Sequence, residues 1–243
     1  MTMTKADALP LSSPLRTRLR ALAPLSGAEM QALAAAERDQ RRWPARREMI
    51  AEGAPITQAR AIVSGWACRQ RILPDGRRQI LDFLLPGDLI GVSPLSNPLA
   101  PATILAVTEV VTCALPAAAA GMPGLSHAYT VSAALTELYT LAQVTRLGRL
   151  SAQERLADWL LETRDRLALA GQTVGDNLPV PLTQELLADA LGLTSVHVNR
   201  TLQSMRRDGL LAGRSGMFLL ADRQRLEILA GYRSARVTAD TEP

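Results

Sequence analysis

The sequence has few of the residues on which enzymes and metal proteins depend. Its 243 residues include two cysteines and two histidines, and aromatic side chains make up 3%. Two well-separated thiols, Cys68 and Cys113, exclude a disulfide framework and a four-cysteine iron–sulfur site, and we interpret them as buried and inert. Because His127 and His197 add no metal-like spacing, we expect no metal and no cofactor. No nucleophile–base pair or phosphate loop is visible, so we expect a protein that is not an enzyme.

The sequence also lacks a long uninterrupted apolar run. Its most apolar window, residues 102–122, contains Glu109 and Pro116 and is β-branched in its first half. That composition fits a buried strand and a loop better than a membrane span. The N-terminus is polar and does not resemble a signal peptide. We therefore expect a cytoplasmic protein with no membrane partner.

Basic charge is unevenly distributed along the chain. The net charge is +4, Lys5 is the only lysine, and residues 79–145 contain neither lysine nor arginine. The arginines gather in residues 16–78 and 146–225. A small positive charge alone is a weak indication of a nucleic-acid partner.

The most informative segment is residues 182–211, LTQELLADALGLTSVHVNRTLQSMRRDGLL. Thr183 and Thr194 are candidate caps of two short helices, and Gly192 can take the positive φ that ends the first. A buried stripe is expected in the second helix at Val198, Leu202 and Met205. This layout predicts a helix-turn-helix whose second helix enters the DNA major groove. The alternative, an ordinary helical hairpin with Arg200 and Arg206 on a solvated face, is disfavoured by the paired caps and the segment that follows.

That following segment, residues 210–222, has two short apolar runs around GRSG. Such a pattern predicts a β-hairpin, here with Arg214 at its tip. A hairpin directly after the recognition helix makes a winged helix-turn-helix, in which Arg214 would touch a phosphate. Residues 223–232 then have the pattern of a terminal helix, and residues 234–243 that of a frayed polar tail.

The N-terminal half has a different pattern. Helical spacing in residues 12–36, with a cap at Ser26, gives way after Trp43 to short apolar segments separated by turns such as Pro-Asp-Gly at 74–76. Short strands at this spacing predict an antiparallel sandwich or jelly roll. Residues 125–147 are again helical, and an apolar seam of coiled-coil spacing is formed by Val131, Leu135, Leu138 and Ala142.

The chain resembles the Crp/Fnr family of bacterial transcription regulators in this order of elements. The resemblance is most specific in three segments: VSGWACRQRILPDGRRQILDFLLPGDLIG, SAQERLADWLLETRDRL and residues 182–211. The resemblance covers about residues 22–232. It implies an α+β fold with a β-roll sensor at 1–124, a dimerisation helix at 125–149 and a winged helix-turn-helix at 150–243. It also implies a cytoplasmic homodimer that binds a palindrome in double-stranded DNA, with RNA polymerase as a further partner.

The resemblance also assigns the site residues. Base contacts fall on Ser195, Val196, Asn199 and Arg200, and Arg200 matches the family's arginine, which can bond bidentately to guanine. Val196 stands where family members have a glutamate, and could touch a thymine methyl instead. Contacts to the DNA backbone are expected from Thr183, Gln184, Thr194, His197, Gln203 and Arg214. The dimer interface is expected at Val131, Leu135, Leu138 and Ala142.

The sensor departs from the family's cyclic-AMP pattern. Members that bind cyclic AMP hold its phosphate with an arginine and its ribose with a glutamate, but residues 89–105, LIGVSPLSNPLAPATIL, contain neither. A buried phosphate without a cation would be badly desolvated. We therefore expect a regulator that is not controlled by cyclic AMP and whose small-molecule effector, if one exists, is unidentified. The alternatives are a cyclic-nucleotide module with a non-standard pocket, or a haem sensor in which Cys68 or His127 would be an axial ligand.

Overall fold

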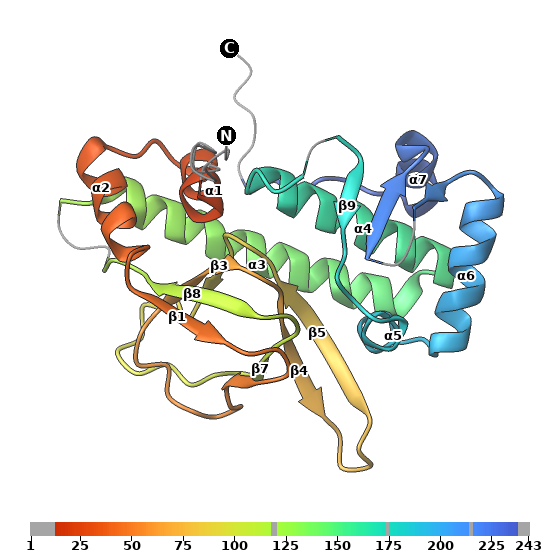
Figure 1. Cartoon of the computed structure of the whole chain (residues 1–243), viewed down its shortest axis with the longest axis horizontal. Coiled ribbons are helices and arrows are strands. Elements are labelled where there is room, and N and C mark those ends of the chain that lie inside the picture. The colour runs from red at the N-terminus through yellow and green to blue at the C-terminus, as the bar shows by residue number, and fades with distance from the viewer. Residues whose placement is uncertain (1–12, 118–120, 174, 214–215, 238–243) are drawn as a thin grey trace, which may run out of the picture.

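The computed structural model describes residues 13–117, 121–173, 175–213 and 216–237, and in these ranges a β-roll is followed by a helical half (Figure 1). The helices are α1 (Pro14–Leu22), α2 (Gly27–Ala36), α3 (Pro123–Arg149), α4 (Ala152–Leu169), α5 (Gln184–Leu191), α6 (Ser195–Arg207) and α7 (Arg223–Ala230). The strands are β1 (Gln40–Trp43), β2 (Glu48–Ile50), β3 (Arg60–Ser64), β4 (Ala67–Ile72), β5 (Arg78–Leu84), β6 (Leu89–Ile90), β7 (Thr103–Ala106), β8 (Val110–Ala114), β9 (Asn177–Pro179), β10 (Leu211–Ala212) and β11 (Met217–Leu220).

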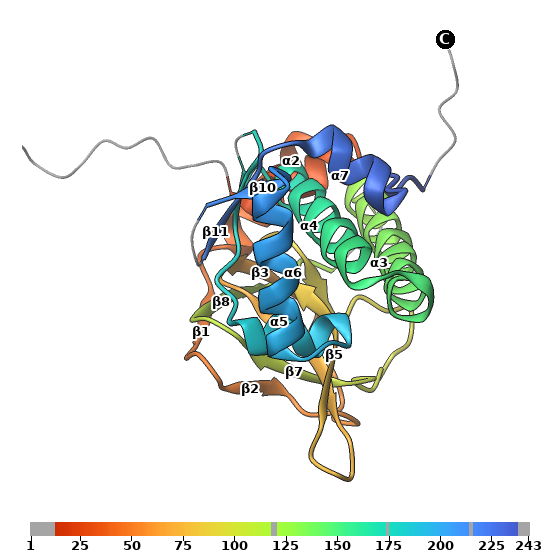
Figure 2. The same ribbon diagram turned by 90° about the vertical axis from the view of Figure 1, so that its right-hand side faces the viewer.

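Two antiparallel sheets form the roll, in the orders β1-β8-β3-β6 and β2-β7-β4-β5. Their inward side chains, among them Ile62, Ile104 and Val110, are buried in a common apolar core. The β4–β5 hairpin projects from the roll and turns at Gly76, where φ is +84° (Figure 2). The predicted Pro-Asp-Gly turn and the antiparallel roll are therefore confirmed.

The helices begin where their capping residues predict. Ser26 and Glu29 form a reciprocal capping box at the start of α2, and Ser151 and Glu154 form another at the start of α4. The long helix α3 begins two residues before, and ends two residues after, the helix expected at 125–147. In the described part of the chain no helix is both long enough and apolar enough to cross a bilayer.

The helical half is packed directly on the roll, which the sequence did not predict. Phe83 of β5 lies between Trp66 and Trp159 of α4, with ring centroids 6.0 and 5.7 Å away. At the same boundary Arg78 of β5 pairs with Asp189 of α5 at 2.6 Å. One apolar cluster therefore runs from the roll into the C-terminal half.

A buried ionic cluster centred on Asp88 joins the two halves. Asp88 ends the Pro-Gly-Asp turn between β5 and β6 and is 6% exposed. Its carboxylate accepts from Arg18 of α1 and, at 2.7 Å each, from Arg166 of α4 and the backbone N–H of Leu85. The preceding Gly87, with φ of +92°, leaves the space that α1 occupies.

The cluster continues into α3 and α4. Glu162 pairs with both Arg166 and Arg146, and Arg146, 2% exposed, also pairs with Asp158 at 2.6 Å. Every one of these buried charges therefore has an opposite charge within 4 Å, as burial of ionised groups requires. The cluster joins α1, the roll, α3 and α4 into one unit.

The C-terminal segment differs from the expected frayed tail. Tyr232 and Ser234 both donate to the Asp165 carboxylate, at 2.9 and 2.6 Å, so residues 234–237 are held against the helices. The prediction of a frayed tail was wrong for these four residues because it considered the polar composition and not the partner on α4. Residues 238–243 lie outside the described ranges.

We expect Asp88→Asn to lower the free energy of unfolding by about 3–5 kcal/mol, because removing one member of a buried ion pair leaves its partners uncompensated. Urea unfolding at pH 7 measures this. Asp75→Asn is the matched control, since Asp75 lies at the exposed hairpin turn and pairs only with Arg77 among the described residues. A loss for Asp88→Asn no larger than that for Asp75→Asn would contradict the structural role.

The effect should depend on pH. Burial acts to raise the pKa of Asp88, but Arg166, Arg18 and the Leu85 N–H more than offset this, so its pKa lies below 3.8. A carboxyl whose pKa is lower in the folded state stabilises the protein above its unfolded pKa and loses this contribution as the pH falls through the folded value. The difference between wild type and Asp88→Asn should therefore be constant above about pH 5 and shrink below about pH 4.

Candidate nucleic-acid interface

Local sequence signals position α5 and α6 as a helix-turn-helix. Thr183 and Thr194 cap the two helices, accepting from the N–H groups of Leu186 and His197 at 3.2 Å each. Gly192 ends α5 with φ of +63°, and its α-carbon lies so close to Leu147 that a side chain would be crowded. The two predicted caps and the predicted glycine are confirmed. The turn between the helices is thus specified locally.

Helix α6 has two opposite faces. The predicted stripe of Val198, Leu202 and Met205 is buried, as expected. Opposite to it, at intervals of four, three and four residues, lies an exposed stripe that consists of Val196, Arg200, Gln203 and Arg207. Val196 is 60% exposed, so the stripe offers one apolar side chain to a partner beside its polar and basic groups.

The exposed stripe carries two arginines that form no ion pair within the described part of the chain. Among the residues that the structure describes, neither Arg200 nor Arg207 has an acidic group within 4 Å. Both guanidinium groups can therefore meet an external anion or a guanine edge. The sequence interpretation did not single out Arg207, although its spacing of seven from Arg200 indicates the same helix face.

The other predicted contact residues lie beside this stripe. Asn199 is half-buried and donates to the Gln184 side chain at 3.0 Å, which ties α6 to the start of α5. Ser195 is exposed in the first turn of α6. Exposed positions are also found for Thr183, Gln184, Thr194, His197 and Gln203. Arg214, the predicted wing contact, lies outside the described residues.

A groove of about 760 Å³ separates α6 from the start of α4. His197 and Arg200 line its α6 side, and Ser151 and Gln153 line the opposite side. Gln153 donates to Ser204 at 3.2 Å, which links α4 to α6 beside the groove.

The wing has one more strand than predicted. Strands β10 and β11 pair antiparallel as the expected hairpin, and β9 pairs along the outer edge of β11. Pro179 and Pro181 made a strand here unexpected from the sequence, because proline is disfavoured in central strands. As an edge strand β9 tolerates it.

The roll offers little to an anionic ligand. Cys68 and Cys113 are buried, as expected, and burial raises their thiol pKa values to about 12 and about 11. Ile56 packs onto Gly91, near the start of residues 89–105, which contain no Arg, Lys or Glu. In the described residues no three His, Cys, Asp or Glu side chains are grouped so that they could hold a metal ion.

A roll, a long helix and a winged helix-turn-helix define a regulator that reads DNA, and comparisons with known proteins agree. Residues 40–120 match the model of the cyclic nucleotide-binding domain, and residues 154–229 match that of the Crp-like helix-turn-helix domain. The two matches divide the chain on either side of α3.

Relatives that match about two thirds of the chain or more identify the family of DNA-binding regulators more closely. The nitrogen fixation regulation protein FixK of Bradyrhizobium diazoefficiens is 36% identical over 66% of this chain and 68% of its own length. The transcriptional activatory protein AadR of Rhodopseudomonas palustris is 30% identical over 78% and 80%. The solved structure of FixK2 from Bradyrhizobium japonicum is similar with a TM-score of 0.70, at 26% identity, and covers 82% of this chain and 98% of that one. The chain belongs to the Crp/Fnr family of DNA-binding transcription regulators.

We expect Arg200→Ala to abolish sequence preference while leaving weak, salt-sensitive DNA binding. A bidentate arginine–guanine contact contributes about 1–3 kcal/mol of discrimination, so affinity for the selected site should fall about 5- to 150-fold. A site first selected from a random DNA pool, then titrated by fluorescence anisotropy, provides the measurement. Arg20→Ala, which removes the same charge from exposed α1, is the control. Unchanged affinity for the selected site would contradict the assignment of Arg200 as a base contact.

Proposed function

We propose that the protein binds a palindromic DNA site as a homodimer, with α6 of each subunit in successive major grooves about 34 Å apart. The observation that carries this proposal is the exposed stripe of α6, whose two arginines have no acidic partner within the described chain. Val196, Arg200 and the side chains beside them, Ser195 and Asn199, would contact bases. Arg207 and His197 are at positions suited to phosphates.

Val196 predicts a site unlike that of relatives with glutamate at this position. A carboxylate accepts a hydrogen bond from a cytosine amino group, whereas a valine can only make apolar contact, for which the thymine methyl is the partner. The selected DNA sites should therefore be rich in thymine at the position that Val196 faces. The relatives' descriptions as activators also support RNA polymerase as the target of the bound dimer.

The proposed dimer interface is the outer face of α3. Of the four residues expected there, Leu135 is only 5% exposed within one chain, while Val131, Leu138 and Ala142 are half-buried. Leu141 is 56% exposed although it is apolar. We therefore place the seam on residues that recur at intervals of three and four along the outer face: Val131, Ala134, Leu138, Leu141 and Thr145. We call these residues the α3 seam.

We expect Leu141→Asp to raise the dimer dissociation constant at least 100-fold, because a charge would be buried in the middle of the seam. Sedimentation equilibrium over a range of concentrations measures this. Ile228→Asp is the matched control: Ile228 is 73% exposed on α7, away from the seam. Equal dissociation constants for the two variants would contradict the proposed interface.

We also propose that the roll does not bind a cyclic nucleotide. A phosphate there would need a cation or several N–H donors, but residues 79–145 contain no Lys or Arg and Pro94, Pro98 and Pro101 remove donors from the segment. Asp88, at the nearby turn, is already paired to Arg18 and Arg166. The match to the cyclic nucleotide-binding domain supports the fold of the roll, and we propose that it does not extend to binding of the phosphate.

Isothermal titration of the protein with cyclic AMP and with cyclic GMP should show no binding heat at millimolar ligand. The same titrations should leave the affinity for the selected DNA site unchanged. Micromolar binding of either nucleotide would overturn this part of the proposal and favour a sensor with a non-standard pocket.

A further inference from the structure

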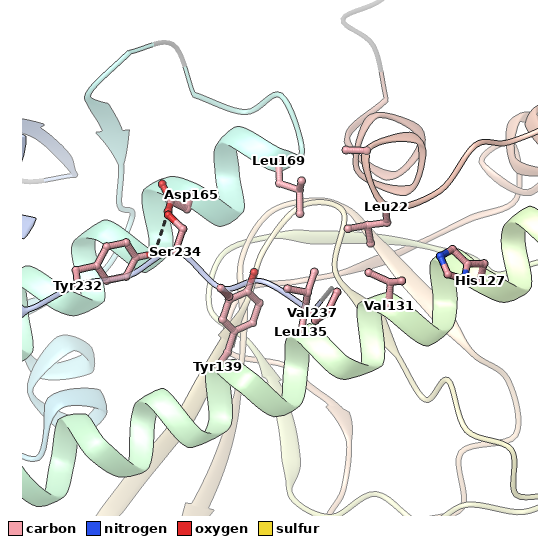
Figure 3. A pocket seen from close by; sticks show the side chains of 12 residues that line it. Leu22, His127, Val131, Leu135, Tyr139, Asp165, Leu169, Tyr232, Ser234 and Val237 are labelled. Atoms are coloured by element: carbon pink, nitrogen blue, oxygen red, sulfur yellow. Dashed lines mark hydrogen bonds between the residues drawn. The ribbon is translucent and has the colours of Figure 1, made fainter. Parts of the chain in front are cut away.

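The chain turns back after α7 and lies along α3. Gly231, with φ of +59°, ends α7, and residues 232–237 then pass α4 toward the middle of α3 (Figure 3). We call residues 232–237 the C-terminal strap. In Figure 3 its Tyr232 and Ser234 lie beside Asp165 of α4, and its Val237 lies over Leu135 of α3.

Two kinds of contact hold the strap. The Asp165 carboxylate accepts from the Tyr232 hydroxyl at 2.9 Å and from the Ser234 hydroxyl at 2.6 Å. Beyond this anchor Ala235 and Val237 are half-buried, whereas their neighbours Ser234 and Arg236 are exposed. The apolar side chains of the strap are thus more buried than the polar ones beside them.

The strap is packed loosely on α3. Ala235 and Val237 border a cavity of about 350 Å³ that is also lined by Leu22, Val131 and Tyr139. Further along, residues 232–236 border a second cavity, of about 250 Å³, together with Leu138 and Ala142. Side chains that border unfilled space lack contact atoms on one side and gain little dispersion energy. The strap can therefore be displaced by a better-fitting apolar surface.

The side chains that the strap flanks include two members of the α3 seam. Val131 lines the first cavity and Leu138 lines the second. In a two-stranded coiled coil each seam side chain inserts between four residues of the partner helix. A second α3 would need the space around Val131 and Leu138 in which the strap lies.

We propose that the C-terminal strap and a second copy of the chain compete for the α3 seam, so that a dimer forms only when the strap is released. This inference rests on the proposed homodimer. The strap covers part of an apolar helix face in the monomer, and the partner's seam replaces it. Since only the dimer presents two copies of α6 to a palindrome, strap closure also raises the protein concentration that DNA binding requires.

Competition between the strap and a second copy should change the dimer dissociation constant by a measurable factor. If the closed strap is favoured about tenfold in the monomer, the free fraction of each monomer is about one tenth, and release of both straps strengthens dimerisation up to about 100-fold. Deletion of residues 233–243 should therefore lower the dimer dissociation constant by at least tenfold in sedimentation equilibrium. Deletion of residues 238–243 is the matched control, because it shortens the same end and leaves the strap, and should change nothing.

A full-length variant makes the test independent of truncation. In Ala235→Glu/Val237→Glu two carboxylates would replace half-buried apolar side chains, in cavities whose walls already contain Asp165 and Glu162, so the strap should be released and the dissociation constant should fall as in the deletion. The control is Arg233→Glu, which alters an exposed residue of the strap. Circular dichroism confirms that each variant is folded.

The outcomes separate the two proposals. Tighter dimers in both release variants, with unchanged controls, support the strap. An unchanged dissociation constant in the release variants overturns it, and a weaker dimer does so as well, since the strap would then be part of the interface. If wild type and both release variants stay monomeric at every concentration, with and without the selected DNA, the proposed homodimer fails and the strap proposal with it.

Discussion

The position of the DNA-reading half relative to the roll depends on one carboxylate. Asp88 lies in a turn of the roll and is held by guanidinium groups from α1 and α4, Arg18 and Arg166, in a site that water barely reaches. Such a cluster costs desolvation energy and adds little net stability compared with an apolar substitute. Its partners have fixed donor geometry, however, so they permit one arrangement of the elements that they join. Because the start of α4 lines the groove beside α6, the cluster also fixes the position of this groove relative to the roll.

Among the described residues, buried arginines are paired with carboxylates, whereas those on the exposed stripe of α6 are not. In the described part of the chain the buried arginines, Arg18, Arg146 and Arg166, are each paired with a carboxylate, whereas Arg200 and Arg207 are not. A paired guanidinium orients packing, and an unpaired exposed one is available to phosphates and base edges. The net charge of +4 conceals this distinction. The arrangement of the arginines, more than their number, makes α6 suitable for DNA.

Helix α3 packs against several elements at once. One face packs on α1, β5 and α4, and Arg146 at its C-terminal end belongs to the ionic cluster. The outer face carries the α3 seam, and the C-terminal strap lies along the edge between the two. Because α3 has packing partners on more than one side, its apolar residues are not confined to a single face. This explains why heptad spacing alone suggested Leu135 for the dimer interface, although the fold of one chain buries it.

Capping residues, apolar periodicity and turn residues were sufficient to predict the short strands and turns of the roll, α5, the Gly192 turn and the two stripes of α6, because these features depend on neighbours within a few residues. The same local patterns, with the family resemblance, located Arg200 and Val196. They could not predict the Asp88 cluster, since Arg18, Asp88 and Arg166 are separated by 70 and 78 residues, nor that a polar C-terminal segment would find Asp165. Local sequence therefore determined the elements and the DNA-reading helix, while packing between distant segments decided how that helix is held and which face of α3 stays free. Interactions between distant residues form only when the chain has folded, and the sequence pattern around each one carries no trace of its partner.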